Sequence, residues 1–171
     1  MRGFGLVVGL GENGSSDCPT ALREYLVEYL QKEFLSPEPG EPKPSVTPQE
    51  LIESKDTAVV SITGLVAPGA PRGSFFDLRV EALPGTSTRS LEGGLLLPSE
   101  LRLFNVSQSG QGLLAGHVLA RARGPIFTNP FVGADGATSV DLRRGYVLGG
   151  GWTTEERTLK FTLIEPSYPQ A

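Results

Sequence analysis

Residues 2–14 decide the fold of this chain, and they read Arg2-Gly3-Phe4-Gly5-Leu6-Val7-Val8-Gly9-Leu10-Gly11-Glu12-Asn13-Gly14. The apolar run 6–8 is short, partly β-branched and bounded by glycine on both sides, which indicates a buried strand. Five glycines stand within residues 3–14, so the backbone turns sharply or packs closely there. Two interpretations compete: a nucleotide-binding turn, or a structural strand that turns and seats a helix.

The nucleotide interpretation rests on the pattern G-x-G-x-x-G between Gly9 and Gly14, directly after the strand. Dinucleotide binding requires a helix that opens within the glycine turn, so that its N–H groups meet the pyrophosphate. Here residues 15–19 separate the turn from the helix, and Asp17 would add negative charge near the phosphates. A proline-rich stretch then replaces the expected second strand. We favour the structural strand and keep a nucleotide-binding enzyme as a remote alternative.

Composition limits the class of protein. The chain has 171 residues, of which 39% are hydrophobic and 20% charged, which is enough for a globular domain with a core. Its 22 glycines and 14 prolines favour turns and short strands. The net charge of -4 argues against a nucleic-acid partner. No apolar run approaches the ~20 residues that span a membrane. Cys18 is the only cysteine, which excludes an internal disulfide and a cysteine-based metal site.

The pattern along the chain predicts an α+β fold, in which a β-rich domain of mostly antiparallel strands carries one long amphipathic helix near the N-terminus. The long helix is expected over residues 19–34, with Ser16 or Asp17 as its N-cap. A proline-rich loop over residues 36–48 leads to a short helix that Thr47 caps. Strands are expected over residues 57–66, 75–83, 95–97, 101–106, 113–122, 139–142, 145–148 and 158–164, with a hairpin loop at 107–112.

No motif for chemistry is present. The chain has no zinc spacing, no phosphate loop with lysine and no nucleophile elbow. The lone histidine, His117, has no nucleophile or second ligand marked by a motif, so we expect a structural role for it. Tyr25 and Tyr29 continue a leucine face at helical spacing, which favours core packing over sugar stacking. We therefore expect that the protein is not an enzyme and that it binds no cofactor or metal.

Six stretches, in the same order along the chain, resemble the bacterial flagellar P-ring protein family. Residues 3–10, 56–63, 68–77, 90–97, 145–156 and 159–166 are similar, in that order, to the family segments GYGLVVGL, NVAAVMVTA, PPFARPGSRID, SLRGGTLL, GAIVERE and LTLNLRNPDF. In the third stretch Arg72 matches the family's arginine and Asp77 its aspartate. In the fourth, Glu92 stands where the family carries an arginine.

The resemblance implies a structural subunit of the flagellar basal-body P ring in the periplasm, without catalysis or cofactor. Such subunits would form a homo-oligomeric ring that surrounds the rod as a bushing, next to the L ring, and is anchored in peptidoglycan. The family's export signal and roughly the second half of its chain are missing. We therefore expect residues 1–171 to be a single P-ring-protein-like domain from a longer chain. The alternative is a non-flagellar module that binds cell-wall glycan or serves as a scaffold.

Two loop arginines, Arg72 and Arg89, are the candidates for contact with an acidic rod surface. The plainer interpretation is that both are solvated, because exposed charges often contribute little to binding or stability.

Overall fold

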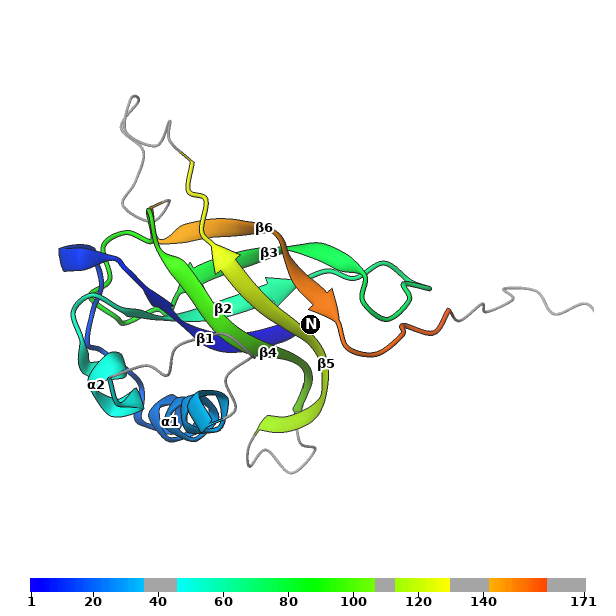
Figure 1. Cartoon of the computed structure of the whole chain (residues 1–171), viewed down its shortest axis with the longest axis horizontal. Coiled ribbons are helices and arrows are strands. Elements are labelled where there is room, and N and C mark those ends of the chain that lie inside the picture. The colour runs from blue at the N-terminus through cyan, green and yellow to red at the C-terminus, as the bar shows by residue number, and fades with distance from the viewer. Residues whose placement is uncertain (36–45, 107–112, 130–141, 160–171) are drawn as a thin grey trace, which may run out of the picture.

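A computed structural model describes residues 1–35, 46–106, 113–129 and 142–159 of the chain. Figure 1 shows a β-barrel with two helices on one side of it. In chain order the elements are β1 (Arg2–Val8), the 3-10 turn η1 (Gly11–Asn13), α1 (Thr20–Leu35), α2 (Pro48–Glu53), β2 (Ala58–Gly64), β3 (Phe75–Ala82), β4 (Leu95–Val106), β5 (Leu113–Pro125) and β6 (Arg144–Thr153).

The six strands close into a barrel in the order β1-β2-β3-β6-β5-β4. Every neighbouring pair is antiparallel. The prediction of a β-rich, antiparallel fold with one long helix is confirmed in these broad terms. Closure of the sheet was not predicted, because alternation along a strand shows which side chains face inward but not which strands become neighbours.

Strand β1 is buried on both of its faces. Successive side chains of a strand point to opposite sides of the sheet. Val7, 0% exposed, points into the barrel, where it belongs to the core that includes Val60. Leu6, 1% exposed, points outward and packs with Leu26 of α1 in a second core beneath the helices. Burial on both sides explains why the run 6–8 is apolar throughout rather than alternating.

Glycines in β1 allow β4 to cross it closely. A Cβ atom on Gly5 would collide with Oγ of Ser99, and one on Gly3 would collide with the carbonyl oxygen of Glu100. A side chain at either position would therefore force β4 away from β1. The first two glycines of the stretch serve close strand packing.

The helices agree with the sequence pattern, except at one cap. The predicted helix 19–34 is observed as α1, and the predicted short helix as α2. Thr47 and Glu50 form a reciprocal capping box on α2, where Thr47 N–H donates to Glu50 Oε2 at 3.0 Å and Glu50 N–H donates to Thr47 Oγ1 at 3.3 Å. The expected role of Asp17 as N-cap of α1 is wrong, because its carboxylate accepts from Ser87 instead.

Among the described residues, no helix combines the length and apolar character needed to cross a membrane.

Two predicted strands are one strand in the structure. The sequence suggested separate strands at 95–97 and 101–106, since Pro98 interrupts the pattern. Instead β4 continues through Pro98, and its register with β5 shifts between Leu96 and Ser99. Proline is tolerated in a strand at such an irregularity because no ladder hydrogen bond is required there.

Strand β6 also runs further than predicted and carries a bulge. Its pairing with β3 shifts between Phe76↔Gly151 and Leu78↔Val147, so Asp77 alone lies opposite residues 148–150. Gly149 has a φ of 60°, which favours glycine. The Gly149 N–H donates to Asp77 Oδ1 at 2.7 Å and thereby fixes the bulge. The glycines 149–151 therefore continue the strand instead of ending it.

Several expectations fall outside the described residues. These are residues 36–45 of the proline-rich loop 36–48, the hairpin loop 107–112, and most of the strands predicted at 139–142 and 158–164. Leu142, Thr158 and Leu159, which the structure does describe, are not in strands.

The double burial of β1 makes a prediction about stability. We expect Leu6→Ala to lower the free energy of unfolding by about 3 kcal/mol, because it removes a fully buried leucine side chain beneath the helices. Leu65→Ala is the matched control, since Leu65 is 86% exposed, and it should change the value by less than about 0.5 kcal/mol. Urea unfolding followed by circular dichroism measures both. Equal effects of the two substitutions would contradict the arrangement of two cores around β1.

Candidate functional site

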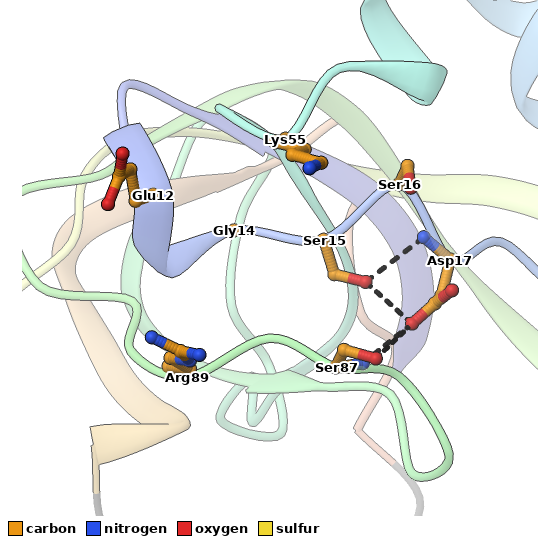
Figure 2. A pocket seen from close by; sticks show the side chains of 8 residues that line it. All are labelled: Glu12, Gly14, Ser15, Ser16, Asp17, Lys55, Ser87 and Arg89. Carbon is orange, nitrogen blue, oxygen red and sulfur yellow. Dashed lines mark hydrogen bonds between the residues drawn. The ribbon is translucent and has the colours of Figure 1, made fainter.

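Three loops meet around a polar hollow at one end of the barrel (Figure 2). The loops are the connection from β1 to α1, the link from α2 to β2, and the connection from β3 to β4. The hollow has a volume of about 520 Å³. Its lining is polar and consists of Glu12, Gly14, Ser15, Ser16, Asp17, Lys55, Ser87 and Arg89. We call this site the polar hollow.

Asp17 joins two of these loops. Its Oδ2 accepts from the Ser87 N–H at 2.8 Å, from Ser87 Oγ at 2.6 Å and from Ser15 Oγ at 2.8 Å. The hydrogen bonds from Ser87, followed by the one from Ser15, hold the pKa of Asp17 below its ordinary value because they stabilise the charged carboxylate. Figure 2 shows these bonds on one side of the hollow. The carboxylate of Asp17 is therefore engaged in hydrogen bonds within its own loop and to the loop that carries Ser87.

Lys55 and Arg89 supply positive charge to the hollow from different loops. Figure 2 shows them on opposite sides of the backbone at Gly14 and Ser15. Both are exposed, and neither side chain has an ion-pair partner within the part of the chain that the structure describes. The backbone of Arg89 is fixed, since its N–H donates to the Asn13 carbonyl at 2.8 Å. The lining also holds two carboxylates, Glu12 and Asp17, and that of Asp17 is already engaged by Ser15 and Ser87. Lys55 and Arg89 are therefore the charges of the hollow that are available for contact with acidic groups on a partner.

The structure does not support the dinucleotide hypothesis for the turn between Gly9 and Gly14. The carboxylate of Asp56 accepts from the Gly11 N–H at 2.6 Å and from the Gly9 N–H at 3.3 Å. The Leu10 N–H donates to the Asp56 carbonyl at 3.0 Å. A protein carboxylate thus occupies the donors that a phosphate would need. In addition, β1 has antiparallel neighbours on both sides, whereas the dinucleotide motif belongs to a parallel sheet.

The described ranges contain no metal-binding cluster of side chains. No group of three or more histidine, cysteine, aspartate or glutamate side chains there could hold a metal ion. His117 is exposed on β5. Tyr25 and Tyr29 pack against the core beneath the helices, with stacked rings whose centroids are 6.3 Å apart, as the leucine pattern indicated.

Of the two predicted contact residues, only Arg89 lies in the polar hollow. Arg72 is exposed in the loop between β2 and β3. This loop is at the end of the β2–β3 pair where Gly64 lies opposite Leu78. The loop that carries Arg89 leaves the other end of β3, where Ala82 pairs with Val60. The two arginines therefore lie at opposite ends of the barrel and cannot form one small patch.

Sequence reasoning missed Lys55 and the bond from Asp17 to Ser87. Residues 17 and 87 are 70 positions apart, and no motif connects them. Lys55 lies in the short link between a helix and a strand, where an exposed lysine is common and does not by itself indicate a function. The one available signal was the run of polar residues 12–17 after a buried strand, which indicates an exposed loop but not its neighbours.

Comparisons with known proteins give one consistent result. The model of the family described as flagellar P-ring protein matches residues 1–165. The flagellar P-ring protein of Campylobacter jejuni is 27% identical over 162 residues, which cover 95% of this chain and 40% of the relative. That of Anaeromyxobacter dehalogenans is 30% identical over 167 residues, covering 95% and 38%. That of Aquifex aeolicus is 32% identical over 129 residues, covering 72% and 32%. The chain thus spans about two fifths of the length of these relatives or less.

The hydrogen bonds of Asp17 predict how it titrates. Because its folded pKa is lowered, its contribution to stability is present above the unfolded pKa and is lost as the pH falls through the folded pKa. We expect carbon-detected NMR titration to give Asp17 a pKa below the ordinary value of about 3.9. Ser87→Ala should raise that pKa toward the ordinary value. Ser16→Ala, an exposed neighbour that does not bond to Asp17, serves as control, and equal titration in all three proteins would contradict the bonding.

The closed glycine turn makes a second prediction. We expect no saturable binding of ATP or NAD at millimolar concentration, measured by isothermal titration calorimetry, because Asp56 already occupies the amides of Gly9 and Gly11. Binding that disappears in Gly11→Ala would revive the nucleotide hypothesis.

Proposed function

Because the chain belongs to the flagellar P-ring protein family, we propose that it forms the barrel module of a subunit of the flagellar basal-body P ring. The family is that of a periplasmic component of the flagellar basal body. In this proposal the subunits assemble into a closed homo-oligomeric ring around the rod, next to the L ring, and the ring serves as a bushing anchored in peptidoglycan. The family match over residues 1–165 is the observation that carries the proposal. Residues 1–171 would act together as one P-ring-protein-like domain.

The barrel suits a structural role of this kind. The six strands close into a barrel, although β5 pairs with β6 only over Ala120–Ala122, so the sheet offers little free edge to strands from other chains. Contacts with partners would then be made mainly by side chains on its outer faces and end loops. Such contacts can be strong toward a neighbouring subunit and weak toward a rotating rod.

The polar hollow is the proposed rod contact. Lys55 and Arg89 present two positive charges at one barrel end. The bonds of Asp17 and Asn13 hold the loop of Arg89, and Asp56 ties the loop of Lys55 to the glycine turn. Opposite charges across such a contact steer association and set its orientation more than they add affinity. Arg72, at the other end of the barrel, is a separate candidate. If one end of the barrel faces the rod, the rod would contact either Arg89 or Arg72, but not both.

A deletion tests the proposal directly. Removing the gene should abolish swimming and leave basal bodies without the P ring under electron microscopy, and a plasmid copy should restore both. Motile cells with intact basal bodies after deletion would refute the role.

Charge reversal tests the proposed rod contact. We expect Lys55→Glu combined with Arg89→Glu to reduce swarm diameter several-fold, because two attractive charges become repulsive toward an acidic rod. Arg89→Lys preserves the charge and should swim normally. Arg72→Glu, tested alone, shows whether the opposite end is involved instead. If both reversals leave motility unchanged while the proteins fold normally by circular dichroism, these residues do not contact the rod.

A further inference from the structure

The two sides of the barrel differ. In the closed order β1-β2-β3-β6-β5-β4, β6 is three strands from β1 in either direction, so the two lie on opposite sides. Figure 1 shows α1 and α2 on the side away from β6. The helices cover the outer face of β1, where Leu6 packs with Leu26 and Leu30. No described helix covers the outer face of β6.

The bare side presents large apolar side chains. Phe75 is 76% exposed, Leu148 62% and Tyr146 53%. Phe75 lies directly opposite Trp152 across the β3–β6 pair. The guanidinium of Arg123 lies over the Trp152 ring, 5.6 Å from its centroid. A concentration of exposed apolar side chains on one face marks an interaction site more often than scattered ones do. We define the β6 face by these five side chains together with Arg121.

The β6 face is not flat. Two adjoining hollows of about 370 and 530 Å³ share Arg123 and Gly150. Leu148, which lines the larger hollow, stands in the bulge that Asp77 fixes through the Gly149 N–H. An exposed leucine held by a hydrogen-bonded bulge loses little conformational freedom on binding, so it can serve as an anchor.

The two sides also differ in charge. Strands β5 and β6 contain Arg121, Arg123 and Arg144 and no carboxylate. The two carboxylates of β3 are already engaged, Asp77 with Gly149 and Glu81 with Arg79 and Arg144. The helices carry the opposite balance, with Glu24, Glu28, Glu33, Glu50 and Glu53 against Arg23 and Lys32. Glu53 pairs with Arg23 and Glu28 with Lys32, so Glu24, Glu33 and Glu50 make up the excess. We call the outer surfaces of α1 and α2 the helix layer.

We propose that the β6 face of one copy docks on the helix layer of the next copy, and that this head-to-tail contact builds the ring. The occupant is a second copy because the chain itself offers a complementary acidic surface on the opposite side of the same barrel. A contact between two different patches is heterologous, and it generates a ring when the rotation between copies closes. Faces on opposite sides let each copy hold two neighbours at once. The inference rests on the proposed ring function and names the surfaces that make it.

Cysteine cross-linking tests this pairing of faces. Glu24→Cys and Leu148→Cys are introduced together in a Cys18→Ser background, in cells that produce the variant in place of their own copy, and a short bismaleimide is added. The double variant should give a ladder of dimers, trimers and longer products. Each single variant should give monomers only, because a heterologous contact never brings two copies of one position together. The two single variants produced in one cell should give dimers and no ladder.

The control keeps Glu24→Cys and replaces Leu148→Cys by Thr63→Cys. Thr63 is exposed on β2, which lies between the two faces in the barrel order. We expect several-fold less cross-linked product from the control than from the double variant.

Three results would overturn the inference. One is a dimer from Leu148→Cys alone, which would show that β6 faces pair with each other. Another is a motile double-cysteine strain whose products do not exceed those of the Thr63→Cys control. If the double variant is not motile, purified protein is cross-linked at high concentration, and the lack of product above the control overturns the pairing as well. These results refute only the choice of faces. A P ring that still assembles after gene deletion refutes the ring function itself.

Discussion

Strand β1 must satisfy two hydrophobic cores at once, and the rest of the structure depends on that constraint. Val7 and Leu6 are adjacent in sequence, yet one fills the barrel and the other seats α1. A shift of one residue in the register of β1 would exchange these side chains between the two cores. The pairing of Leu6 with Val59 of β2, which also faces the helices, fixes the register from the neighbouring strand. The helices and the barrel are therefore joined into one body through β1.

The same strand determines what lies at its end. After Val8 the chain must leave the barrel wall and reach the start of α1, and Asp56 holds that turn through the amides of Gly9 and Gly11. Asp17 then ties the connection to the loop between β3 and β4. The polar hollow is the space that these fixed loops leave between them. Its exposed cations, Lys55 and Arg89, lie on hydrogen-bonded loops, so their places on the surface are fixed.

The outer surfaces of the barrel differ in charge and polarity. Lys55 and Arg89 on the end loops have no ion-pair partner among the described residues, the helices carry excess negative charge, and the β6 face carries apolar side chains beside arginines. Because closure leaves little free sheet edge, side-chain chemistry distinguishes these surfaces. In the proposed ring, this distinction would allow tight binding of neighbours and weak binding of a moving rod.

The sequence by itself determined the type and place of most elements, but not the extent of β4 and β6. Period-two alternation located β3, leucines at helical spacing located α1, and Thr47 with Glu50 located the start of α2. It also carried the family resemblance, because similar segments occur in the same order. The tertiary structure decided which strands are neighbours, and hence that the sheet closes, that β6 lies opposite the helices and that Arg72 and Arg89 are at opposite ends. It also decided that Asp17 bonds to Ser87 rather than capping α1. Local patterns record the environment of each residue, whereas contacts such as these join positions some 70 residues apart, which periodicity along the chain cannot record.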